Sequence, residues 1–176
     1  MSISTIPDSM DDTQPLLPLS NKWNLFYHLQ SDNRWTIESY RVIMRDIQHA
    51  ESVVALNRQI PDYLLYNTMF FCMKDGVGPT WEDKKNRDGG CFSYCVANAE
   101  VGNVWRRLLC MMCGGTLCVN TKHEQHINGI TISPKKKFVV IKIWLDVCKL
   151  QDPNIIRDIP HLSKVGCLFK KHAPEF

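Results

Sequence analysis

The chain has 176 residues, a length that suits a single domain with a substantial hydrophobic core. Hydrophobic residues make up 44% of it and charged residues 22%, which is typical of a globular protein and excludes a largely disordered chain. The net charge of +3 favours an anionic partner, but it is small for a protein that coats duplex nucleic acid. The longest apolar run, "FVVIKIWL", is short and contains Lys142, so we expect no membrane partner.

The first 20 residues are rich in Ser, Asp and Pro and lack periodicity, so we expect a flexible segment over residues 1–20 and one folded domain over residues 21–176. The start of the chain has no basic-then-apolar signal pattern. Eight cysteines are therefore interpreted as reduced thiols in a cytoplasmic protein.

The first half of the chain predicts strands with one helix between them. "KWNLFYHL" and "SYRVIMRDI" are typical of strands, and "AESVVALNRQI" has helical spacing that Pro61 ends. "YNTMFFCMK" predicts a buried strand, and "GCFSYCVA" predicts another. Between these two strands, "GPTWEDKKNRDGG" at residues 78–90 predicts a loop, because it is polar and bracketed by glycines.

The second half begins with the strongest helical pattern, "NAEVGNVWRRLLCMMCGG", in which apolar residues share one face. "NGITIS" and "KFVVIKIWLDV" predict two strands joined by a hairpin around "PKKK". "DPNIIRDIPHL" predicts a short helix and "KVGCLFKK" a last strand. Strands interleaved with a few helices and joined by hairpin-like turns predict an α+β protein with a mainly antiparallel sheet.

Two tryptophans fall in polar segments where an indole has no evident core to join: Trp35 in "QSDNRWTIES" and Trp81 in the loop. Two indoles can sandwich a flat ring, with roughly 1–3 kcal/mol per stacked base and more for a cationic ring. Glu82 can accept two parallel hydrogen bonds from the N1 and N2 edge of guanine. The set fits cationic 7-methylguanine, with the hairpin lysines Lys135, Lys136 and Lys137 attracting its phosphates; Lys142, Lys170 and Lys171 are the alternatives.

The same segments resemble the eukaryotic translation initiation factor 4E family, which binds the 7-methylguanosine cap of mRNA. "KDGVGPTWEDKKNRDGG" is similar to that family's signature loop nearly residue for residue. "NKWNLFYHL", "RWTIESYRVI", "NVWRRLLCMMCG" and "VVIKIW" follow in the family's order at about its spacing. The resemblance extends from residue 18 to about residue 170.

The resemblance implies a curved antiparallel sheet backed by about three helices, with the cap on the concave face. By position, Trp35 and Trp81 match the stacking tryptophans, Glu82 the guanine-edge carboxylate, and Trp144 the tryptophan that contacts the N7 methyl group. It also implies a monomeric cytoplasmic initiation factor that recruits capped mRNA to ribosomes, with no catalysis and no cofactor.

Several positions depart from the family's pattern, as they would in a divergent or virus-encoded member. Ser133 and Cys91 stand where the family has arginines on the phosphate side, and the hairpin is about two residues longer. Val54 replaces the tryptophan that docks a helical peptide of the scaffold factor, and Arg106 replaces a leucine of that surface. Helix-in-groove binding needs apolar anchors, so the alternative is a regulator that sequesters caps without the scaffold partner.

The cysteines and histidines raise two other classes of function, a zinc-stabilised module and an enzyme. Cys110 and Cys113, with His123 and His126 downstream, have nearly the spacing of a zinc site, so a zinc-stabilised RNA-binding module is the alternative from a different class. Both cysteines lie in an apolar helical run, which favours buried thiols and no metal. No cysteine has a recognisable nucleophile context and no phosphate-cradling loop is present, so we expect no catalytic residues.

Overall fold

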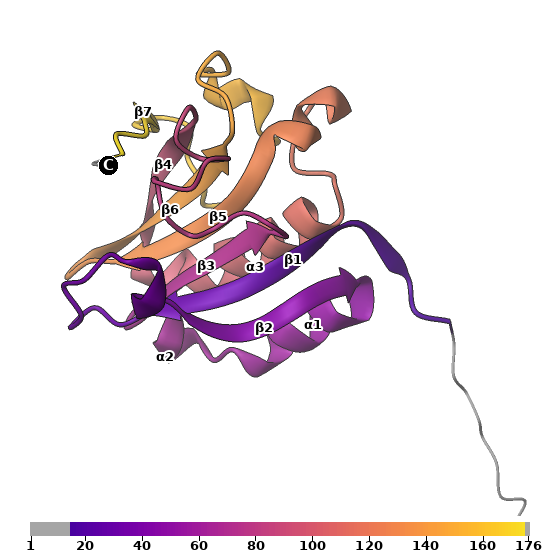
Figure 1. Cartoon of the computed structure of the whole chain (residues 1–176), viewed down its shortest axis with the longest axis horizontal. Helices are drawn as coiled ribbons and strands as arrows, with labels where there is room; N and C mark the ends of the chain where they lie inside the picture. Colours follow the sequence, from indigo (N-terminus) through magenta and orange to yellow (C-terminus); the bar gives the residue numbers. More distant parts are fainter. Residues whose placement is uncertain (1–14, 175–176) are drawn as a thin grey trace, which may run out of the picture.

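The computed structural model describes residues 15–174 (Figure 1). Within these residues seven strands form one antiparallel sheet in the order β2-β1-β3-β5-β6-β4-β7. The strands are β1 (Pro18–His28), β2 (Arg41–His49), β3 (Met69–Lys74), β4 (Gly90–Ala97), β5 (Ile127–Pro134), β6 (Phe138–Leu145) and β7 (Leu168–Lys171). The predicted antiparallel α+β fold is confirmed.

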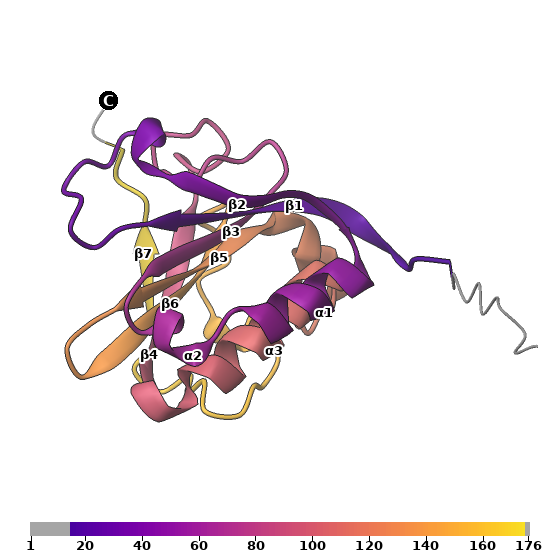
Figure 2. The ribbon, with the colours of Figure 1, turned by 90° about the horizontal axis from the view of Figure 1, so that it is seen from below.

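Three α-helices occur in the described chain: α1 (Ala50–Gln59), α2 (Asp62–Leu65) and α3 (Val101–Cys113). Figure 2 shows α1 and α3 side by side along one face of the twisted sheet, with the loops after β1 and β3 on the opposite side. Trp105, Leu108 and Leu109 of α3 are buried in the main core, which fills the space between helices and sheet. Gly114 caps α3, and its backbone N–H reaches the Cys110 carbonyl.

Side-chain alternation along the central strands separates two hydrophobic clusters. On β6, Ile141 and Ile143 point into the main core, whereas Trp144 belongs to a second cluster on the other face. The buried members of that second cluster are Phe26, Phe71, Met73, Val77, Cys91 and Trp144. The sheet therefore has one face covered by helices and a concave face with an apolar floor.

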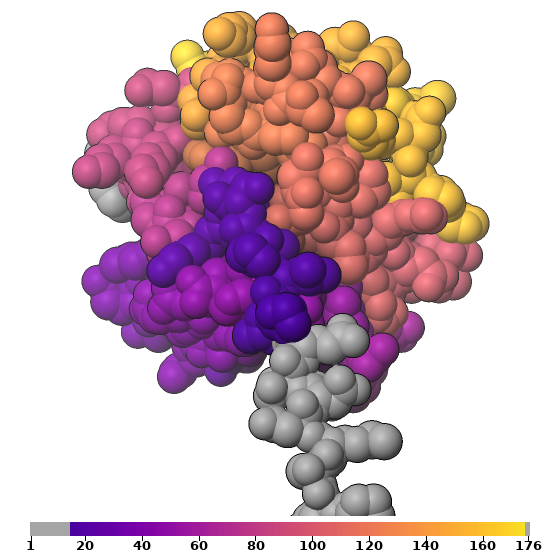
Figure 3. All heavy atoms as spheres, turned by 90° about the vertical axis from the view of Figure 1, so that its right-hand side faces the viewer, coloured from indigo at the N-terminus to yellow at the C-terminus, as the bar shows by residue number. Residues whose placement is uncertain are grey.

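The start of the described chain is fixed at the first residues of α1. The Ala50 N–H donates to the Leu17 carbonyl at 2.9 Å, and the Leu17 N–H donates to the Glu51 carboxylate. The first described residues of the chain are among the indigo atoms of Figure 3. The segment 1–20 that was expected to be flexible lies mostly outside the described residues, and Pro18–Ser20 are already part of β1.

The short helix predicted in "DPNIIRDIPHL" is wrong, because the structure has only a 3₁₀ turn, η4, over Pro153–Ile155. Beyond the turn the backbone pairs with a distant segment: Ile156 forms a bridge with Cys118, and the Arg157 N–H donates to the Leu117 carbonyl at 2.9 Å. Pairing across the chain thus replaces the local helical hydrogen bonds.

The remaining 3₁₀ turns are η1 (Ile37–Ser39), η2 (Asn98–Glu100) and η3 (Thr121–His126). No helix within residues 15–174 is long and apolar enough to cross a bilayer.

Candidate functional site

The concave face of the sheet holds a cleft of about 820 Å³. It brings together five of the seven residues predicted to contact the cap: Trp35, Trp81, Glu82, Trp144 and Lys135. Residues from the loop after β1, the loop after β3, strands β3, β5 and β6 and the segment after β7 also contribute: Gln30, Asn33, Thr36, Tyr40, Met69, Phe71, Pro79, Thr80, Thr131, Ser133, Pro134, Lys142 and Ala173. The cleft is thus lined by aromatic side chains together with a few charged ones.

Trp35 stands in a short, well-fixed loop between β1 and η1. The Asp32 carboxylate accepts from the Arg34 backbone N–H at 3.0 Å and forms a two-point pair with the Arg34 guanidinium. The same side-chain contact lowers the pKa of Asp32. The Trp35 indole is 52% exposed and stacks on the His28 imidazole, with centroids 4.4 Å apart and planes 6° from parallel. One indole face is packed, and the side chain still lines the cleft.

Trp81 is presented by a loop whose backbone is held by a buried amide. The Asn86 side chain is fully buried and donates to the carbonyls of Gly78 and Thr80, at 2.8 Å each. It also accepts from Asn128 at the start of β5, at 2.9 Å. Because loop backbone groups must find partners when they are buried, this amide fixes the turn that carries Trp81.

The two neighbouring carboxylates of this loop have different surroundings. Asp83 accepts from the backbone N–H groups of Gly78 at 2.9 Å and Lys85 at 2.8 Å, so its oxygens are engaged in the fold. Glu82 lines the cleft, and its carboxylate accepts none of the hydrogen bonds found within residues 15–174. Tyr40 also lines the cleft, where burial first and the charge of Glu82 second raise the pKa of its phenol. Glu82 therefore has acceptor oxygens available to a ligand.

Trp144 forms part of the cleft floor. It is 3% exposed, and its indole N–H donates to the Thr131 hydroxyl at 3.1 Å, which fixes the ring across β5 and β6. Phe71 and Tyr40 meet edge to face nearby, with centroids 5.0 Å apart. The floor is thus a rigid aromatic surface.

The cationic side chains near the cleft come from both the hairpin lysines and the alternatives named from the sequence. Of the three hairpin lysines, Lys135 lines the cleft, whereas Lys136 and Lys137 do not. Lys142 lines it from β6, and its ammonium lies 5.8 Å from the centroid of the Trp81 ring. The Lys170 ammonium of β7 lies 5.0 Å from the same ring. Lys142 is two residues before Trp144, so strand alternation alone places both on one face.

His172 is a residue of the site that the sequence interpretation missed. It is 3% exposed and lies against Trp81, with centroids 5.6 Å apart, and against Trp144, with centroids 4.7 Å apart. Burial lowers the pKa of this imidazole; Lys142 acts in the same direction, and the hydrogen bond to Asn86 and the charge of Glu82 oppose it. No pattern in "KKHAPEF" indicates this contact, which depends on β7 pairing with β4.

The surface predicted to contact a protein partner is on the helical side of the sheet. Val54 of α1 is 43% exposed there. Arg106 of α3 is not a free charge: its guanidinium donates to the carbonyls of Asn57 at 3.0 Å and Ile60 at 3.2 Å and pairs with Asp62. It connects the end of α1, the start of α2 and the middle of α3.

Three of the four residues considered for zinc have separate partners, whereas the buried Nδ1 of His123 has no hydrogen-bond partner within residues 15–174. Cys110 accepts from the Asn57 amide at 3.0 Å, and His126 contacts the Asp146 carboxylate at 2.8 Å. A hydrogen bond with Cys72, together with burial, raises the pKa of the Cys113 thiol. Within residues 15–174 no three His, Cys, Asp or Glu side chains are grouped so that they could hold a metal ion.

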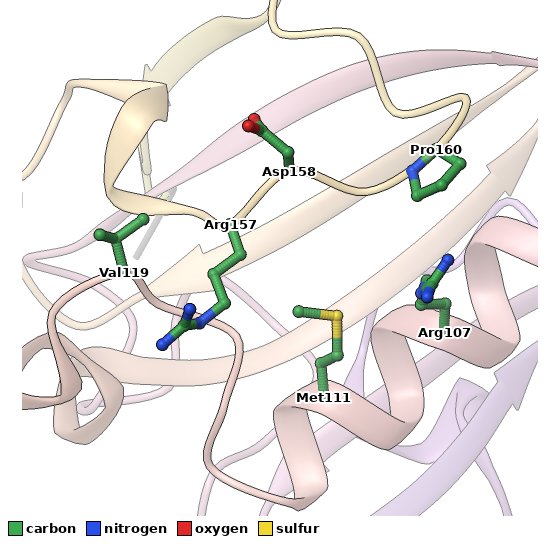
Figure 4. Close-up of a pocket in the computed structure, with 6 residues that line it drawn as sticks. All are labelled: Arg107, Met111, Val119, Arg157, Asp158 and Pro160. Carbon is green, nitrogen blue, oxygen red and sulfur yellow. The ribbon is translucent and has the colours of Figure 1, made fainter.

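A second cavity, of about 540 Å³, lies between α3 and the segment after η4 (Figure 4). Its lining consists of Arg107, Met111, Val119, Arg157, Asp158 and Pro160. None of these six side chains is aromatic, so this cavity offers no indole or phenyl ring on which a base could stack. The concave cleft is the better candidate site.

Comparison with known proteins gives an independent result. The family model described as "Eukaryotic initiation factor 4E" matches residues 18–170. Eukaryotic translation initiation factor 4E of Candida glabrata is 25% identical over 174 residues, covering 95% of this chain and 77% of that protein. The factor of Eremothecium gossypii is 28% identical over 162 residues, covering 87% and 69%. The C. elegans eIF4E-3 structure, in complex with the 4E-binding protein Mextli and a cap analog, is 21% identical with a TM-score of 0.67, covering 76% of each chain.

Proposed function

Since the chain belongs to the eukaryotic initiation factor 4E family, we propose that it binds the 7-methylguanosine cap of mRNA and acts in translation initiation without catalysing a reaction. The observation that carries the proposal is the cleft itself, in which two fixed indoles, an available carboxylate and lysines meet. Such a role is performed in the cytoplasm, and we expect a monomer.

In this proposal Trp35 and Trp81 stack on the two faces of the base. Each indole has a face that lines the cleft, and stacking is worth roughly 1–3 kcal/mol per base. The positive charge of 7-methylguanine strengthens the attraction to both rings. Glu82 accepts from the N1 and N2 groups of guanine, and Trp144 packs against the methyl group. The free oxygens of Glu82 support its assignment over Asp83.

For the phosphates we propose Lys142 and Lys135, with Lys170 at longer range. The first two line the cleft, and Lys142 and Lys170 both approach the Trp81 ring. Lys136 and Lys137 lie outside the cleft lining and serve at most as distant charges. The lost family arginines at Ser133 and Cys91 are thus replaced by lysines from β6 and the hairpin.

The proposal is tested by titrating the protein with a cap dinucleotide and with its unmethylated form, followed by tryptophan fluorescence. We expect the methylated form to bind at least about tenfold more tightly, because only its base is cationic. Equal affinities would contradict the proposal.

A second candidate function is a cap-sequestering regulator that does not recruit the scaffold factor. Arg106 favours it, because a charged side chain fixed to Asp62 and two carbonyls stands where the family has an apolar anchor. The related C. elegans protein was solved with a 4E-binding protein, so a helical peptide carrying such a protein's binding motif is a suitable probe. Binding of that peptide would favour recruitment, and its failure alongside normal cap binding would favour sequestration.

A further inference from the structure

Each of the two cleft tryptophans is backed by a histidine ring. His28 stacks on Trp35 at 4.4 Å and 6°, and His172 stacks on Trp81 at 5.6 Å and 18°. The indoles line the cleft, whereas the imidazoles do not, so each imidazole lies behind its indole as seen from the cleft. Both are buried, with exposures of 0% and 3%. In both halves of the stacking site a buried imidazole thus supports the indole from behind.

The hydrogen bonds of His28 fix its tautomer. Its Nε2 lies 2.8 Å from the Arg34 carbonyl, which can only accept, so Nε2 carries the proton. The Ser39 hydroxyl at 3.1 Å donates its own hydrogen to the Thr36 carbonyl and is therefore a second acceptor for Nε2. The other ring nitrogen, Nδ1, is buried and has no hydrogen-bond partner within the described chain.

His172 repeats this arrangement with its nitrogens exchanged. Its Nδ1 lies 2.7 Å from the Asn86 carbonyl and must donate, which leaves Nε2 as the buried nitrogen without a partner in residues 15–174. The His172 backbone N–H also donates to the Gly89 carbonyl at 3.0 Å. The imidazole therefore fastens the end of β7 to the loop that carries Trp81.

A second proton is unfavourable at the His172 ring. It would create a buried N–H without an acceptor, at a cost of roughly 1–3 kcal/mol. It would also place a cation behind an indole whose other face must attract a cationic base, and the two cations would compete for the same ring.

The charged groups around His172 do not remove this conflict. The positive charge of Lys142 opposes a second cation at this ring, whereas the negative charge of Glu82 favours it. Lys170 adds positive charge over the Trp81 ring.

We propose that His28 and His172 are positioning residues that hold the two indoles for the cap, and that His172 does so only as a neutral imidazole, so that acidification releases capped RNA. The inference rests on the proposed cap-binding function and adds to it a pH dependence located behind the Trp81 ring. Because burial in the folded state lowers the pKa of His172 and so favours its neutral form, cap affinity is full at neutral pH and is lost as the pH falls and His172 takes up a second proton.

The test measures affinity for a cap dinucleotide, whose bridging phosphates keep their charge, between about pH 7.5 and about pH 5.5. We expect the native protein to lose roughly three- to tenfold in affinity over this range. The double variant His28→Phe/His172→Phe keeps a flat ring behind each indole but cannot be protonated there. The factor by which its cap affinity falls over this pH range should therefore be less than half that of the native protein. His161→Asn is the matched control, because His161 lies outside the cleft and asparagine tolerates its positive φ of 65°. The cap affinity of this control should change with pH as that of the native protein does.

A double variant with the native pH dependence would overturn the inference. Should the phenylalanine variants fold poorly, the native protein supplies a second measurement, in which ring-proton NMR follows His172 with and without saturating cap dinucleotide. Cap binding must move the titration midpoint of His172 to lower pH, and an unchanged or higher midpoint would refute the proposal. A native protein that fails to prefer the methylated cap at about pH 7.5 would instead refute the proposed function itself.

Discussion

Replacing Lys142 with alanine tests how the protein holds the phosphates of its ligand. The ammonium lies 5.8 Å from the Trp81 ring centroid and lines the same cleft, so a phosphate chain attached to the stacked base passes within its reach. Lys142 is half-buried, which screens its charge less than that of a fully exposed lysine.

The expected loss follows from Coulomb's law. Two unit charges about 4 Å apart interact by about 1 kcal/mol in bulk water and by about 4 kcal/mol in the partly screened surroundings of a protein surface. Some of this gain is offset when the lysine gives up its water shell, so we expect Lys142→Ala to weaken binding of the 7-methylguanosine triphosphate by about 1–2 kcal/mol, or roughly five- to thirtyfold.

The assay compares that triphosphate with 7-methylguanosine alone at two salt concentrations. The nucleoside has no phosphates, so its affinity should hardly change, and the salt dependence of triphosphate binding should become flatter in the variant. Lys136→Ala is the matched control, since Lys136 lies outside the cleft lining, and we expect less than a twofold effect from it. Equal losses for Lys142→Ala and Lys136→Ala, or an unchanged triphosphate affinity in Lys142→Ala, would refute the reasoning.

Three further predictions concern the base and the helical surface. Trp35→Ala and Trp81→Ala should each weaken cap binding by roughly 1–3 kcal/mol in a fluorescence or calorimetric titration; a variant of normal affinity would remove that ring from the site, and loss of the cooperative unfolding transition would assign it to the core. Glu82→Gln should reduce cap affinity more than Asp83→Asn, whereas Asp83→Asn should lower the free energy of unfolding by about 1–2 kcal/mol, because Asp83 holds two backbone N–H groups; the opposite ranking in either measurement would contradict the assignment. Arg106→Ala should lower the free energy of unfolding, measured in urea, by about 1 kcal/mol and leave cap affinity unchanged. A change in cap affinity would show that the helical surface and the cleft are coupled.

Local patterns predicted the strands well where the sequence itself marks their ends. β4 begins at Gly90, just after a glycine-bracketed loop, and its residues alternate between buried and exposed positions near its end. The helix over residues 101–113 was also predictable, because its apolar face is wide and Gly114 follows it. By contrast, the segment after Asp152 has helical residues but pairs with the segment around Cys118, and no local signal reports that partner.

The candidate site was predictable in proportion to how much of it lies in one segment. The loop with Trp81 and Glu82 is continuous, so its chemistry could be inferred directly. Lys142 was named only as an alternative to the hairpin lysines, and counting two residues back from Trp144 on the same strand face would have favoured it. His172 could not, because its approach to Trp81 depends on the pairing of β7 with β4 across a long stretch of sequence.

The buried Asn86 has a consequence for the kinetics of ligand capture. Its side-chain amide bonds within the loop and to Asn128 of β5, and its backbone carbonyl accepts from His172 at the end of β7. The loop can therefore open only if contacts with two separate strands break as well, and its conformational entropy is lost during folding rather than on ligand binding. A ligand that diffuses into the cleft meets Trp81 already oriented, so the rate of capture is set by encounter and steering rather than by the closing of a loop.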